Sequence, residues 1–189
     1  LRTRRQRQMC IRDSFRKEGE TETGFVHSGF YVVFKRLWSR LRPQLEQYPR
    51  PWVFTGHSLG GAVAMIGGVV SDADLICTFG APEIGNNHLN QITRDRRIWR
   101  LVNCDDLVTR LPLPDKYLKG RQFSHGEPAK RLIGGGEITG YSDPSDENKL
   151  PFAMANLTEE LQSPPDWFCD HRIGGYCGRL KMAVFRGDA

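Results

Sequence analysis

The sequence predicts an α/β fold, a mostly parallel sheet with flanking helices. Short segments rich in β-branched and aromatic residues alternate with helical segments between residues 25 and 103. The longest apolar stretch, residues 59–70, holds four glycines in 12 residues and is too short to span a bilayer, which indicates a core helix. A length of 189 residues fits one domain with a sizeable core. Strand and helix in this rhythm are typical of a parallel sheet.

The elements follow from local patterns. Apolar residues spaced three and four apart predict a first amphipathic helix, which ends where Pro49 and Pro51 break it. The predicted elements, in order, are helix 25–48, strand 52–55, helix 59–70, strand 75–79, helix 87–93, strand 98–103, helix 151–161 and a terminal helix over 173–184.

Residues 113–150 show no regular pattern, and the glycines at 134–136 and the polar run 142–146 predict mobile loops. The triple glycine is not followed by Lys-Ser or Lys-Thr, so it does not predict a nucleotide-binding loop.

The turn between the strand at 52–55 and the core helix reads Gly56-His57-Ser58-Leu59-Gly60. It fits G-x-S-x-G, the nucleophile elbow of α/β-hydrolases. We expect Ser58 in a strained conformation, with Gly56 and Gly60 removing side chains that would collide in the turn. The Leu59 N–H, at the helix start, would face a developing oxyanion. The alternative is a glycine-rich turn whose serine caps the helix.

A serine nucleophile needs a histidine base and an acid that orients it, and in this fold they follow in the order Ser, Asp, His. Asp106 follows the strand at 98–103 and so lies at the edge where parallel strands place catalytic groups. Asp105 is its competitor. Asp72 and Asp74 precede their strand, at the wrong end of the sheet.

Three histidines compete for the role of the base. His88 precedes Asp106, which is the wrong order. His125 and His171 both follow it. His171 stands between a proline-rich break and the terminal helix, where a loop would deliver its ring to Ser58, and it is preferred.

Six motifs, spread over about residues 25–178, resemble those of the class 3 (fungal-lipase-type) lipase family. In order they are Val26-His27-Ser28-Gly29-Phe30, Thr55-Gly56-His57-Ser58-Leu59-Gly60-Gly61-Ala62, Thr78-Phe79-Gly80-Ala81-Pro82-Glu83-Ile84-Gly85-Asn86, Asn103-Cys104-Asp105-Asp106-Leu107-Val108-Thr109-Arg110-Leu111-Pro112, Phe123-Ser124-His125-Gly126 and Asp170-His171-Arg172-Ile173-Gly174-Gly175-Tyr176. The resemblance implies that Ser58 is the nucleophile, Asp106 the acid and His171 the base. It also implies hydrolysis of acylglycerols or related carboxylic esters, without a metal or organic cofactor.

The chain departs from the family pattern in two respects. Thr109 stands where the family usually has proline. Between Ser14 and Val26 we find neither the turn that supplies the second oxyanion donor nor the helical lid. We therefore expect an N-terminally truncated fragment that lacks the first strands of the sheet. The whole gene product would be an esterase or lipase, and this piece would be weak, inactive or aggregation-prone.

Residues 1–14 carry four of the five net positive charges. The run Arg7 to Asp13 resembles the translation of a sequencing-library adaptor, so we assign residues 1–14 to a non-native segment and residues 15–189 to the lipase-like domain. Without that arm little charge remains to favour nucleic acid. No signal peptide or transmembrane segment is recognised.

The expected partner is a lipid or ester substrate, met at a lipid–water interface in the full-length protein. The alternatives are a phospholipase or feruloyl-type esterase on the same fold, and a non-catalytic lipase-like binding protein.

Cys77 and Cys104 are expected as buried apolar residues. Cys169, His171 and Cys177 lack a C-x-x-C pair and a fourth ligand, so no metal site is predicted, and a Cys169–Cys177 disulfide stays open.

Overall fold

The computed structural model describes residues 26–112, 123–141 and 170–187. The helices and strands predicted between residues 25 and 103, and the terminal helix, start and end within a few residues of the predicted bounds. In chain order they are α2 (Ser28–Leu45), β1 (Val53–His57), α3 (Leu59–Ser71), β2 (Leu75–Phe79), α4 (Asn87–Thr93), β3 (Ile98–Asn103), η1 (Leu107–Arg110), β4 (Ala129–Leu132), η2 (Gly134–Gly136), β5 (Ile138–Tyr141) and α7 (Ile173–Arg186).

The strands form one five-stranded sheet in the order β1-β2-β3-β4-β5. The first four strands are parallel and β5 pairs antiparallel with β4. The register sets His57 beside Phe79 and Phe79 beside Leu101, so β1, β2 and β3 end at a common edge. The prediction of a mostly parallel sheet with flanking helices is confirmed.

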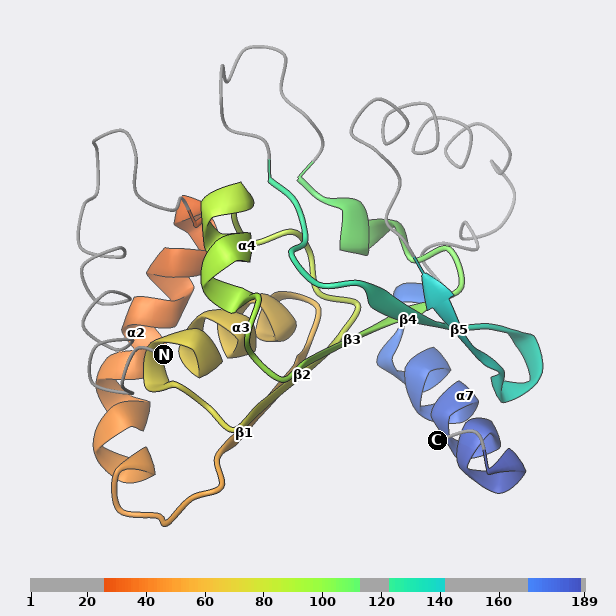
Figure 1. Cartoon of the computed structure of the whole chain (residues 1–189), viewed down its shortest axis with the longest axis horizontal. Helices are drawn as coiled ribbons and strands as arrows, with labels where there is room; N and C mark the ends of the chain where they lie inside the picture. Colours follow the sequence, from red (N-terminus) through yellow and green to blue (C-terminus); the bar gives the residue numbers. More distant parts are fainter. Residues whose placement is uncertain (1–25, 113–122, 142–169, 188–189) are drawn as a thin grey trace.

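Helices cover both faces of the sheet. Figure 1 shows α2, α3 and α4 on one side and α7 on the other. The alternation of side chains along β2 follows this division, because Ile76 packs in the cluster with Phe34 of α2 and Val69 of α3. Cys77 and Phe79 pack instead against the cluster that contains Tyr176 of α7.

The glycine pair in α3 allows the helix to lie close to the sheet. A Cβ atom on Gly67 would come within 2.9 Å of the Phe54 ring, and one on Gly68 within 2.5 Å of the Ile76 side chain. Small residues at this contact therefore fix the distance between α3 and the strands, and with it the place of the turn that precedes the helix.

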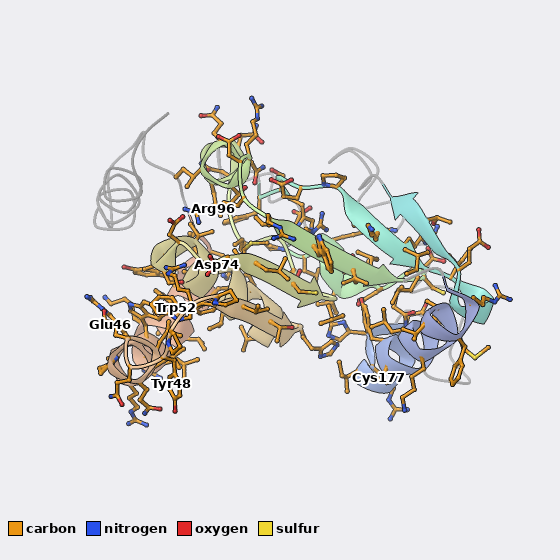
Figure 2. The ribbon with its side chains drawn as sticks, turned by 60° about the horizontal axis from the view of Figure 1, so that its bottom comes forward. Glu46, Tyr48, Trp52, Asp74, Arg96 and Cys177 are labelled. Atoms are coloured by element: carbon orange, nitrogen blue, oxygen red, sulfur yellow. The ribbon has the colours of Figure 1, made fainter. Side chains whose placement is uncertain are left out.

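The amino-terminal edge of the sheet is held by charged residues. Asp74 accepts hydrogen bonds from the Trp52 amide at 2.7 Å and from Arg50 at 2.9 Å, and Trp52 and Asp74 lie close together in Figure 2. Asp72 pairs with Arg96 at 3.0 Å. These two aspartates thus lie at the end of the sheet opposite to the elbow, as predicted.

The structure corrects the prediction for part of residues 113–150. A β-hairpin occupies this region, with β4 and β5 joined through η2, and the triple glycine forms that connection. Alternation is weak in these four-residue strands, which explains why the pattern did not reveal them. The loop at 142–146 and the helix at 151–161 fall outside the described residues.

Two further points concern single residues and helix length. Cys77 and Cys104 are half-buried rather than buried. Within the described ranges, no helix is both long enough and apolar enough to cross a bilayer.

Candidate active site

The elbow places Ser58 between the end of β1 and the start of α3. Its backbone has φ 56° and ψ −127°, a conformation that L-residues rarely adopt. The Ser58 amide donates to the Phe79 carbonyl at 3.0 Å, which fixes the turn to β2. Leu59 is the first residue of α3, where an amide has no carbonyl available within the helix.

The two motif glycines are not equivalent. A Cβ atom on Gly56 would lie 2.2 Å from the Gly60 carbonyl oxygen, so Gly56 is required for the turn to close. A Cβ atom on Gly60 would meet nothing within 4 Å, which contradicts the expected steric role of that glycine. The second close approach lies at Gly61, where a Cβ would come within 2.8 Å of the Ala81 Cβ. The sequence pattern does not reveal this difference because it depends on how α3 sits against the loop after β2.

Three side chains that are far apart in the sequence meet at the carboxyl edge of the sheet. His171 Nε2 lies 2.8 Å from Ser58 Oγ. His171 Nδ1 lies 2.9 Å from each carboxylate oxygen of Asp106. A carboxylate only accepts hydrogen bonds, so Nδ1 carries the proton and Nε2 is free to accept from the serine hydroxyl.

Asp106 is fully buried, and its carboxylate accepts several hydrogen bonds. It follows β3 as the N-cap residue of η1, where Oδ1 accepts from the Val108 amide at 3.0 Å. Oδ2 accepts from the Tyr176 hydroxyl at 2.6 Å. Together with His171, these donors compensate a buried carboxylate for the water that it has lost.

Tyr176 is a site residue that the sequence analysis did not single out. Its side chain is fully buried on α7, and its oxygen also accepts from the Asn103 amide at 3.0 Å. Burial, followed by the negative charge of Asp106, raises the pKa of Tyr176 far above its usual value, so the hydroxyl stays protonated. A tyrosine five residues after the candidate histidine, on the inner face of a helix, was the available signal.

The competing residues have other partners. Asp105 is half exposed and pairs with Arg131. His125 Nε2 lies 2.7 Å from the Thr109 carbonyl oxygen, in the turn after Asp106. The side chain of His88 falls outside the described residues.

In the described part of the chain, no group of three or more His, Cys, Asp or Glu side chains is arranged so that it could hold a metal ion. Cys169 lies outside the described residues, so the disulfide with Cys177 stays open.

Comparison with known proteins identifies the family. A model of the family "Lipase (class 3)" matches residues 3–116. This match includes most of the 1–14 segment, and the exclusion of that segment from the domain stays a prediction.

Two curated relatives and one solved structure illustrate the similarity. The triacylglycerol lipase OBL1 of Ricinus communis is 27% identical over 158 residues, which cover 75% of this chain and 29% of that protein. The secreted mono- and diacylglycerol lipase 2 of Gibberella zeae is 31% identical over 113 residues, 48% of this chain and 28% of that protein. The crystal structure of Lip2 lipase from Yarrowia lipolytica matches with 26% identity and a TM-score of 0.51, covering 65% of this chain and 48% of that one.

The chain thus spans less than a third of the length of these curated relatives. The family match nevertheless covers more than half of this chain, and the fold agrees with it. The chain belongs to the class 3 lipase family.

Proposed function

We propose that the chain carries the catalytic triad of a carboxylic ester hydrolase that acts on acylglycerols or related lipids. Ser58 is the nucleophile, His171 the general base and Asp106 the orienting acid. The observation that carries this proposal is the placement of one imidazole between a strained serine hydroxyl and a buried carboxylate.

The reaction proceeds through an acyl-enzyme. Ser58 Oγ attacks the ester carbonyl carbon while His171 Nε2 takes the hydroxyl proton. Asp106 stabilises the resulting imidazolium, which then gives its proton to the alkoxide that leaves. Water enters, His171 takes one of its protons, and the hydroxide adds to the acyl carbon. The bond between that carbon and Ser58 Oγ then breaks, Oγ takes the proton back from His171, and the carboxylic acid leaves.

The tetrahedral intermediate carries an oxyanion that needs donors. The Leu59 amide is suited to this role because it combines a free N–H with the positive end of α3. The expectation that a second donor comes from an upstream segment stays a prediction. Loss of one such donor would slow turnover by about 10²–10³.

The acylglycerol substrate class is supported by the two curated relatives, whose names specify triacylglycerol and mono- and diacylglycerol lipases. Action at a lipid–water interface in the full-length protein is part of the same proposal. Chain length and head group would be assigned with a panel of p-nitrophenyl esters, acylglycerols, phospholipids and feruloyl esters.

Covalent labelling by a fluorophosphonate tests the proposal, because it reports on the activated serine without requiring turnover. The chain should be labelled, Ser58→Ala should not be, and Asp106→Asn should be slower by a factor on the order of 10³–10⁴. The matched control is Asp105→Asn, which alters the neighbouring carboxylate and should label within about twofold of the parent. If neither this chain nor the full-length protein is labelled when folded, the non-catalytic lipase-like binding protein is favoured.

A further inference from the structure

The segment that carries His171 is held to the sheet through its main chain. Asp170 and His171 present two consecutive carbonyl groups, and each contacts a side chain from the sheet edge. Asn103 Nδ2 donates to the Asp170 carbonyl at 2.7 Å. His57 Nε2 lies 2.7 Å from the His171 carbonyl oxygen. The base is thus fixed by contacts that are separate from those of its own ring.

The contact with the His171 carbonyl determines the proton position on His57. A carbonyl oxygen has no proton to give, so His57 Nε2 must carry the hydrogen. His171 requires the opposite arrangement, with its proton on Nδ1 facing Asp106. Two imidazoles with centroids 4.7 Å apart therefore hold their protons on different nitrogens, each fixed by its own partner.

The hydrogen bond from His57 Nε2 to the His171 carbonyl links the elbow directly to the segment that carries His171. His57 is the last residue of β1 and directly precedes Ser58 in the rigid elbow. One turn therefore holds both the nucleophile and a donor to the main chain of the base, across 114 residues of sequence. A displacement of the His171 backbone would move its Nε2 away from Ser58 Oγ, 2.8 Å distant, although Asp106 stayed in place.

We propose that His57 is a positioning residue, whose Nε2–H holds the His171 main chain so that the imidazole reaches Ser58. The inference rests on the proposed function and assigns His57 no contact with substrate or with the reacting atoms. Misplacement of a catalytic group by about 1 Å lowers rates by as much as ~10². Loss of the donor should therefore slow acylation of Ser58 by about 10- to 100-fold.

Two substitutions at position 57 separate the donor from the volume of the ring. His57→Gln places an amide N–H near the position of Nε2 and should label with fluorophosphonate within about threefold of the parent. His57→Phe fills similar space without a donor and should label about 10- to 100-fold more slowly. His27→Gln is the matched control, because the His27 ring packs against Phe30 and Phe123, and it should label at the parent rate.

Thermal unfolding accompanies each labelling rate, so that only folded protein is compared. A purely structural role would lower the unfolding temperature of both position-57 variants without separating their labelling rates. The proposal is overturned if folded His57→Phe labels as fast as the parent, or if His57→Gln is as slow as His57→Phe.

Nitrogen-15 NMR of the histidine rings at alkaline pH gives a readout that does not depend on activity. In the parent, His57 should carry its proton on Nε2 and His171 on Nδ1. The His171 Nδ1–H resonance should persist in His57→Gln and broaden or shift in His57→Phe. A proton on Nδ1 of His57 in the neutral ring would refute the inference. This readout also separates the two proposals, since absent labelling with the expected ring protonation would fail only the proposed function.

Discussion

The buried carboxylate of Asp106 accepts from three different groups, namely the His171 ring, the Val108 amide and the Tyr176 hydroxyl. The first two follow from the triad order and from the turn after β3. The third comes from α7, on the opposite face of the sheet from α3 (Figure 1). Its short contact, 2.6 Å, is typical of a hydroxyl that donates to an ionised acceptor.

Tyr176→Phe should therefore impair the site without changing the shape of the core. The change leaves Asp106 Oδ2 and the Asn103 amide without the hydroxyl oxygen that each contacts. A hydrogen bond to a charged group contributes about 1.5–3 kcal/mol, so we expect labelling of Ser58 to slow by about 10- to 100-fold. Tyr48→Phe, at an exposed tyrosine, is the control and should label normally. Equal rates in the two variants would contradict this role for Tyr176.

The buried Tyr176 hydroxyl should also make the stability of the parent chain depend on pH. Tyr176 ionises near 10.0 when unfolded, whereas burial raises the pKa of Tyr176 in the folded chain far above that value. Above about pH 10 the unfolded state therefore holds fewer protons than the folded state, and the free energy of unfolding falls by up to ~1.4 kcal/mol per pH unit. Tyr176→Phe lacks this loss.

The stability advantage of the parent over Tyr176→Phe should thus shrink as pH rises above 10. Urea unfolding at neutral pH and at pH 10–11 measures it. A constant difference across that range would show that the tyrosine is not buried in its protonated form.

At the scale of elements, the elbow is a strand and a helix joined by one strained residue. The positive φ of Ser58 turns the chain back so sharply that the backbone at Gly56 contacts that at Gly60. Helix α3 can follow this sharp turn because its small residues pack directly on β1 and β2. The position of Ser58 therefore depends on how closely α3 packs on the strands.

Two alanine substitutions test this account of the elbow. Gly56→Ala forces a Cβ against a backbone oxygen at 2.2 Å, which no rotamer change relieves, and should cost about 3 kcal/mol or more of folding stability. Gly60→Ala adds a methyl group that meets no neighbouring atom. Because alanine favours a helix more than glycine does, the change should be neutral or should stabilise the fold by up to about 1 kcal/mol. Chemical denaturation of both variants decides the matter, and comparable losses would refute the asymmetry between the glycines.

At the scale of the whole molecule, the positions of His171 and Tyr176 depend on how α7 docks. This helix begins two residues after His171 and packs against the turn that joins β4 and β5. Gly136 in that turn has φ +83°, and a Cβ there would lie 2.5 Å from the Met182 Cβ and 2.6 Å from the Ala183 amide nitrogen. The hairpin thus supports the helix that follows His171.

Gly136→Ala should displace α7 from the hairpin and so impair the candidate active site around Ser58. The left-handed backbone and the clash together should cost about 2–4 kcal/mol, and labelling of Ser58 should slow because Tyr176 and His171 move with the helix. Gly134→Ala, where a Cβ meets nothing within 4 Å, is the matched control. Parent-like stability and labelling in Gly136→Ala would show that the hairpin does not support the site.

The sequence by itself was sufficient for features that arise from local periodicity and short motifs. It placed β2, α4 and β3 at their observed bounds, the elbow at Ser58, and Asp106 after β3. These predictions are correct because strand and helix periods and glycine turns are properties of neighbouring residues. The sequence did not settle the choice between Asp105 and Asp106 or between His125 and His171, because two residues of the same type cannot be told apart without knowing what each one contacts.

Only the tertiary structure decided contacts between distant segments. It brought His171 to Ser58, turned Asp105 out to Arg131, and set the Tyr176 hydroxyl on Asp106. It also distinguished Gly56 from Gly60, and revealed the hairpin on which α7 rests. The reason is physical, because a hydrogen bond or a steric clash depends on distances of a few ångströms between residues far apart in the chain, and the sequence contains those distances only through the packing of the whole fold.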